Sequence, residues 1–145
     1  MLYLKEKKLL MPLTKRDFLI GGLFLYWGEG TKTSEARTAL SNTNPAMIKF
    51  FIQWLKLLNI PLERIRIYLH LYNDMSIEEE INYWSKEINI SKNQFSKPYI
   101  KISNNSSITH KGTFGHGTCN IIFNNARFSE KVLTNLRIIE EQFKI

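Results

Sequence analysis

Polar and apolar residues alternate strictly over positions 64–71, the stretch RIRIYLHL, and this is the clearest periodic pattern in the chain. Because successive side chains of a strand point to opposite faces, the stretch predicts a strand with one buried and one open face. Shorter runs of the same kind predict strands at 36–42, 99–103 and 117–124. The first dozen residues and the polar segment 104–117 lack this pattern, and we expect them to be the disordered parts of the chain.

Other segments carry apolar residues at helical spacing, and they predict helices over 14–30, 45–58, 76–87 and 126–143. Three of these segments begin at good capping residues, which are Thr14, Asn44 and Ser76. Helices mixed with strands predict an α+β domain in which helices cover one face of a roughly four-stranded antiparallel sheet. We assign residues 14–145 to this single domain and residues 1–13 to an N-terminal extension.

The first predicted helix is apolar on almost every side, with the sequence FLIGGLFLYW over residues 18–27. A surface helix normally has a polar stripe, so we expect this helix to be buried all round, by its own domain and by a second molecule. Gly21 and Gly22 each cost about 1 kcal/mol relative to Ala in a helix, which favours the close approach of another backbone at that point.

The same apolar run follows Lys15 and Arg16, as in a targeting segment or membrane anchor. A bilayer-spanning helix needs about 20 apolar residues, so the run is too short to cross a membrane. The single cysteine, Cys119, cannot form an internal disulfide, and we expect a cytoplasmic protein without a membrane partner.

The polar faces of the predicted strands carry bases, aromatic residues and amides, and none of these spans contains an acid. The candidate binding residues are Arg37, Arg64, Arg66, Tyr68, His70, Tyr99, Lys101 and Asn120, together with His110 and Lys111 on the loop before the last strand. Side chains of these types bind phosphates and base edges. An ordinary solvated face would mix acids with bases, so we expect a surface that binds double-stranded DNA.

The overall charge agrees with that expectation. Twenty Lys and Arg residues against 13 Asp and Glu residues give a net charge of +7 and a pI near 9.5. A basic excess on a small domain indicates a polyanion partner, although a surface that is merely rich in lysine is the alternative. His110, His116 and Cys119 do not have the spacing of a zinc site, and Cys119 is predicted to point into the core.

Glu29 stands at the C-terminal end of the first predicted helix, between Gly28 and Gly30. The free carbonyl groups there make the field negative, so an acid is disfavoured by up to about 1 kcal/mol. A carboxylate beside exposed carbonyl groups is an oxygen-rich setting that suits Mg²⁺. The alternative is a solvent-exposed acid in a loop.

The segment from Phe18 to Gly30, FLIGGLFLYWGEG, resembles a divergent LAGLIDADG helix, and its Gly-Glu-Gly end is similar to the end of that motif. The resemblance extends to a bacterial and archaeal group of LAGLIDADG-like proteins through a set of ordered pieces. These are Asn42-Thr43-Asn44-Pro45, Trp54, Leu69-His70-Leu71, Trp84, Gln94-Phe95, His110-Lys111 and Gly117-Thr118-Cys119. An additional predicted helix at 76–87 separates strands that are adjacent in the standard domain.

The resemblance implies a homodimer in which two such helices pack side by side, here through Gly21, Gly22 and Leu25. It implies that the two Glu29 carboxylates hold Mg²⁺ or another divalent cation at the scissile phosphates, with Lys101 or Lys111 neutralising charge in the transition state. The function expected on this basis is a DNA endonuclease. A DNA-binding regulator that does not cleave, or an RNA-binding or maturation factor on the same fold, remains the alternative.

Overall fold

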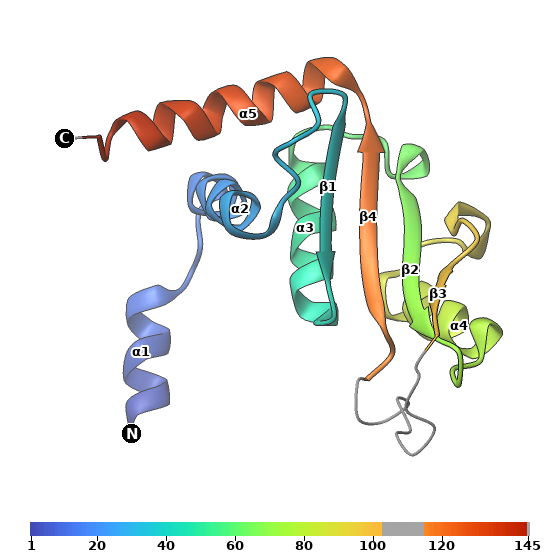
Figure 1. Ribbon diagram of the computed structural model, residues 1–145. Helices are drawn as coiled ribbons and strands as arrows, with labels where there is room; N and C mark the ends of the chain where they lie inside the picture. Colours follow the sequence, from blue (N-terminus) through green and yellow to red (C-terminus); the bar gives the residue numbers. More distant parts are fainter. Residues whose placement is uncertain (103–114, 145) are drawn as a thin grey trace.

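The computed structural model describes residues 1–102 and 115–144 (Figure 1). Five helices and four strands form an α+β fold, and two short 3-10 turns complete it. The helices are α1 (Leu2–Leu10), α2 (Lys15–Glu29), α3 (Pro45–Leu57), α4 (Ile77–Ile88) and α5 (Ala126–Glu141). The strands are β1 (Arg37–Asn42), β2 (Arg66–Tyr72), β3 (Tyr99–Lys101) and β4 (Thr118–Asn124), and the turns are η1 (Leu62–Arg64) and η2 (Lys92–Gln94).

The four strands form one sheet in the order β1-β4-β2-β3. Strand β4 pairs antiparallel with β1 and with β2, whereas β2 and β3 are parallel. The expectation of an all-antiparallel sheet was therefore wrong. The reason is the additional helix: α4 lies between β2 and β3 in the chain and returns it to the end where β2 began, as parallel pairing requires.

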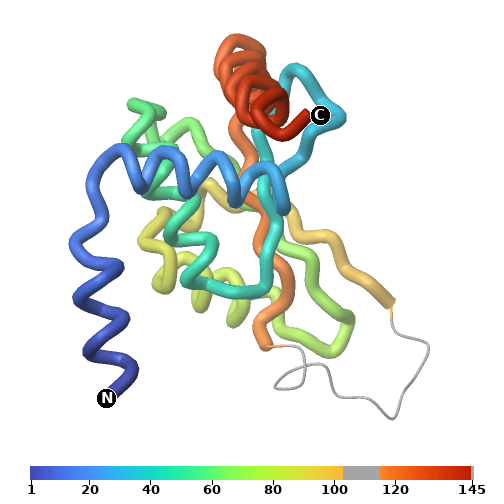
Figure 2. Tube along the Cα trace, turned by 90° about the vertical axis from the view of Figure 1, so that its left-hand side faces the viewer, coloured from blue at the N-terminus to red at the C-terminus, as the bar shows by residue number. Residues whose placement is uncertain are grey.

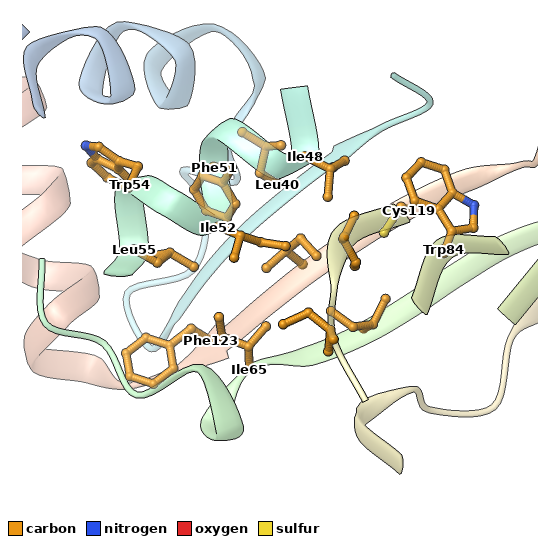
Figure 3. Close-up of a cluster of buried hydrophobic side chains, with 14 of the residues drawn as sticks. Leu40, Ile48, Phe51, Ile52, Trp54, Leu55, Ile65, Trp84, Cys119 and Phe123 are labelled. Atoms are coloured by element: carbon orange, nitrogen blue, oxygen red, sulfur yellow. The ribbon is translucent and has the colours of Figure 1, made fainter. Parts of the chain in front are cut away.

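Helices α3 and α4 cover one face of the sheet, and no helix lies over its other face in the part of the chain that the structure describes (Figures 1 and 2). The alternation of β2 works as predicted, because Ile65, Ile67, Leu69 and Leu71 are all buried. Figure 3 shows the apolar side chains of α3 packed above the sheet, with Trp84 of α4 close to Cys119. Burial raises the pKa of the Cys119 thiol far above its ordinary value, so this thiol is inert.

Helix α2 reaches the sheet mainly through α3. Trp54 of α3 is fully buried, lies against Gly22, and donates its indole N–H to the Leu19 carbonyl at 3.0 Å. The close approach that the glycines indicated is thus an approach of this indole ring to Gly22 within the chain. Gly22 is covered by its own subunit, which corrects its assignment to a dimer interface.

The rest of α2 is not buried all round in one chain. Only Gly22 and Tyr26 of this helix are buried, and Phe24 remains 46% exposed. Gly21 is also exposed, and a Cβ added to it would meet only the Phe50 ring, at 3.7 Å. The helix therefore buries one face against α3 and leaves an apolar face uncovered.

The capping residues define the helix starts as predicted. Thr14 and Asp17 form a reciprocal capping box, with side-chain to backbone distances of 3.1 and 2.9 Å. The side chains of Asn44 and Ser76 accept hydrogen bonds from the first turns of α3 and α4. Among the residues that the structure describes, no helix has the length and apolar character needed to cross a bilayer.

The N-terminal extension corrects another expectation, since residues 2–10 form helix α1 rather than a disordered segment. This helix buries none of its residues. Its sequence, LYLKEKKLL, consists almost entirely of good helix formers, and that local preference outweighed the absence of a cap.

The contact between Gly22 and Trp54 gives a stability prediction. A methyl group added at Gly22 overlaps the indole ring, which is locked in the core, so Gly22→Ala should lower the free energy of unfolding by about 1–3 kcal/mol. Gly28→Ala in the same helix is the control, because a Cβ there meets nothing within 4 Å. Urea denaturation should show no loss for Gly28→Ala, and equal stability of the two variants would contradict the packing described.

Candidate nucleic-acid interface

The register of the strands places one set of polar side chains on the sheet face that the helices leave open. We call this set the open face. It consists of Arg37 and Ser41 on β1, Asn120 and Asn124 on β4, Arg66, Tyr68, His70 and Tyr72 on β2, and Tyr99 and Lys101 on β3. None of the 13 Asp and Glu residues lies in any strand that the structure describes. All net charge within the sheet is therefore positive.

Hydrogen bonds between neighbouring strands fix the centre of the open face. Asn120 donates through Nδ2 to the Tyr68 carbonyl at 3.0 Å and is also in contact with the Ser41 hydroxyl group. Arg37 on β1 contacts the Asn124 side chain at 3.4 Å. The Asn120 amide is thus engaged within the sheet, where it connects β4 to its two neighbouring strands.

The two arginines near the start of β2 have different surroundings. Arg64 lies in η1, outside the strand where the sequence placed it, and is exposed. Arg66 opens β2, and its guanidinium group donates to the carbonyls of Glu63 and Ile65 at 3.3 and 3.4 Å. Of the two, Arg66 belongs to the open face by its strand register with Ile122.

The β2–β3 end of the open face carries aromatic and cationic groups side by side. The His70 ring centroid lies 5.7 Å from that of Tyr68 and 5.3 Å from that of Tyr99. The Lys101 ammonium group lies 5.8 Å from the centroid of the Tyr72 ring. A hollow of about 210 Å³ opens here, lined by His70, Leu71, Tyr72, Tyr99, Lys101 and Thr118.

Glu29 is exposed at the last position of α2, next to the edge strand β1. The chain turns directly after it, because Gly30 forms a bridge to Leu40 and the Thr31 amide donates to the Ala39 carbonyl at 2.8 Å. The Lys32 ammonium group donates to the Gly30 carbonyl at 2.8 Å. The free carbonyl groups at this helix end therefore attract a cation, as expected from the helix dipole.

Tyr26 holds this turn in place, a role that the sequence analysis missed. Its hydroxyl group donates to the Thr31 carbonyl and accepts from the Ala39 amide at 3.3 Å. Burial raises the pKa of Tyr26, which keeps the phenol neutral and able to donate. One buried side chain thus connects the end of α2 to β1 and sets where Glu29 stands.

The predicted catalytic residues do not meet in one chain. Glu29 stands beside β1 and Lys101 lies on β3, at the opposite edge of the sheet. Three strand spacings separate those edges, which is about 14 Å. A shared catalytic centre of Glu29 and Lys101 within one chain is therefore ruled out, and Lys101 belongs to the open face. His110 and Lys111 lie outside the described residues.

In the described ranges no three His, Cys, Asp or Glu side chains gather as a metal site would require. Cys119 points into the core as predicted, and His116 is engaged elsewhere. His116 Nδ1 lies 2.7 Å from Oε2 of Glu80, and its ring stacks on Tyr83 with the centroids 3.5 Å apart. The Trp84 indole donates to the His116 carbonyl at 2.8 Å, which further ties the start of β4 to α4.

The sequence analysis also missed this buried carboxylate. The Glu80 side chain is 1% exposed, and its second oxygen, Oε1, has no hydrogen-bond partner in the described part of the molecule. The spacing of Glu80, Trp84 and Ile88 was a usable signal, because it puts the acid on the apolar face of α4.

Comparison of the chain with protein-family models, with curated proteins and with solved structures finds no match.

The Glu80–His116 pair gives a second prediction. His116→Ala leaves a buried carboxylate without its partner and should lower the free energy of unfolding by about 1–3 kcal/mol. The double variant Glu80→Gln/His116→Ala should lose less than the sum of the single variants, since it removes the buried charge. His70→Ala, an exposed histidine on the open face, is the control and should stay within about 0.5 kcal/mol of the parent. Additive losses in urea denaturation would show that the two groups are not coupled.

Proposed function

We propose that this chain binds double-stranded DNA through the open face. The observation that carries the proposal is the distribution of charge. Arg37, Arg66 and Lys101 lie on the one sheet face that the described helices leave open, and every acid lies outside the strands. A concentrated positive surface attracts the phosphate backbone, and antiparallel strands such as β4 and β2 can enter the major groove.

We further propose that two copies associate through α2. Gly21, Phe24 and Gly28 recur at helical spacing on the side of α2 away from the buried Gly22 and Tyr26, and the half-buried Leu25 flanks them. A Cβ added at Gly28 meets nothing within 4 Å, and Gly21 is exposed beside the Phe50 ring, so another helix can approach closely. The exposed ring of Phe24 adds apolar surface to this stripe. Such an interface would be two-fold symmetric and would imply a roughly palindromic site.

The same arrangement would bring two Glu29 carboxylates together at the ends of adjacent helices. Mg²⁺ takes several oxygen ligands, and one chain offers one carboxylate at this place, so the site requires both copies. Glu29 fits that role because its carboxylate oxygens are exposed. The adjacent Gly30 carbonyl already accepts a hydrogen bond from the Lys32 ammonium group, so this helix end favours a cation. A divalent cation held there would supply an activated water and stabilise the leaving oxygen of a phosphodiester. On this basis we propose DNA endonuclease activity.

One observation favours a second function, which is DNA binding without cleavage. Lys101 is about 14 Å or more from the edge of the sheet where Glu29 stands. Of the two predicted catalytic lysines, the one that the structure describes is therefore not beside the acid. A regulator needs only the open face and the paired copies, and it would not need Glu29.

DNA binding itself is tested by salt dependence. Arg66→Ala should weaken binding to duplex DNA several-fold and reduce the slope of log K against log salt concentration by about 1, because one fewer counterion is released. Lys56→Ala removes the same charge from an exposed position on α3, in the helix layer, and should change neither quantity appreciably. Fluorescence anisotropy with a labelled duplex at several salt concentrations makes the measurement. Equal slopes for the parent and Arg66→Ala would remove the open face from the interface.

Cleavage is tested separately with supercoiled plasmid and Mg²⁺. Glu29→Gln should abolish nicking and leave DNA affinity within about twofold, since it removes a metal ligand at the edge of the sheet. Phe24→Glu should abolish nicking and also shift sedimentation from dimer to monomer, because a charge is unfavourable in an apolar helix pair and this side chain is exposed in a single chain.

The outcomes separate the two functions. Binding without nicking by the parent protein supports the regulator. Nicking that survives in Glu29→Gln removes this carboxylate from the chemistry, and a parent that sediments only as a monomer removes the paired site.

A further inference from the structure

The aromatic end of the open face suits a ligand that a perfect duplex does not offer. Paired bases in B-DNA present only their edges in the grooves, while their flat faces are stacked inside. The Tyr99 side chain is 53% exposed, and His70 beside it is exposed as well. Exposed aromatic faces are the groups on which unpaired bases stack, with little regard to sequence.

The parallel pairing of β2 and β3 builds this surface. It sets His70 opposite Tyr99 and Tyr72 opposite Lys101, so that two adjacent cross-strand pairs form one patch. The His70 and Tyr99 rings are tilted by 46° and their centroids lie 5.3 Å apart, and both side chains line the hollow. The Lys101 ammonium group lies over the Tyr72 ring and supplies the positive charge of that patch.

The hollow at this patch has the size of a small planar group. Its volume of about 210 Å³ is below the 300–1,000 Å³ of ordinary small-molecule pockets, so it fits one ring system better than a whole metabolite. Its lining supplies a stacking ring in Tyr99, polar edges in His70 and Thr118, and a cation in Lys101. These are the groups that hold one base together with its phosphate.

We propose that this hollow binds an unpaired base of DNA, stacked on Tyr99, while the rest of the open face grips the adjoining duplex. The proposal rests on the DNA binding proposed above and narrows its substrate to DNA that carries an unpaired base. An unpaired base enters without the cost of breaking a pair, which a base taken from an intact duplex would incur.

The experiment uses three duplexes that are identical except at one central position. One carries a single bulged 2-aminopurine, a fluorescent adenine analogue, one carries an abasic bulge, and one is fully paired. The abasic bulge has the same extra backbone and flexibility but no ring. The parent protein should bind the 2-aminopurine bulge about tenfold more tightly than the abasic bulge, and it should quench the 2-aminopurine fluorescence by stacking.

Tyr99→Leu should bind both bulges equally, at the parent's affinity for the abasic bulge, and should give no quenching. Tyr99→Phe should keep the preference, because the ring remains. His70→Ala is a second variant on the opposite strand and should reduce the preference. Thermal unfolding checks that each variant is folded. We expect the Tyr99 variants to fold, because this side chain is half-exposed.

Equal affinity of the parent for the two bulges, or a preference that survives in Tyr99→Leu, would overturn the base site. Tight binding of the fully paired duplex in the same series would leave the DNA-binding proposal standing. Failure to bind any of the three duplexes would overturn both proposals together.

Discussion

The contact between Trp54 and Gly22 is the constraint on which the rest of this structure depends. Gly22 and Tyr26 are the two buried residues of α2, and they fix the helix on α3 and β1, while half-buried apolar side chains of α2 pack beside them. The indole ring occupies the space that any larger residue at position 22 would need, and its N–H satisfies the Leu19 carbonyl. With α2 fixed on α3, its opposite face turns outward and its C-terminal end comes to the edge of the sheet.

Tyr26 then converts the position of the helix into the position of the candidate site. Its hydroxyl group joins the turn after Glu29 to the backbone of β1, so the carboxylate stands beside the edge strand instead of on a loose loop. The two anchors lie four residues apart on the same face of the helix, and Phe24 between them is exposed on the opposite face. The face on which copies could pair and the acid are thus parts of one rigid element.

Much of this could be predicted from the sequence, because the relevant information is local. The alternation in β2 predicted its buried face, and the capping residues of α2, α3 and α4 predicted their starts. The polar residues of the open face followed from the same period of two. The parallel pairing of β3 could not be predicted in this way, since it depends on where α4 returns the chain and not on the local pattern of β3. The distance between Glu29 and Lys101 could not be predicted either, because it depends on the strand order, which is a property of the whole sheet.

The pairings that local patterns could not predict also distinguish the two ends of the open face. Near the β1 edge, the β4 residues Asn120 and Asn124 form hydrogen bonds with neighbouring strands, and the surface is polar. At the β3 edge, the parallel register gathers two aromatic rings, an imidazole and an ammonium group around a hollow. A uniformly basic face would attract any polyanion equally along its length. The unequal face found here gives the sheet two chemically different edges, one with engaged amides next to the acid of α2 and one with aromatic rings and a cation at the far side.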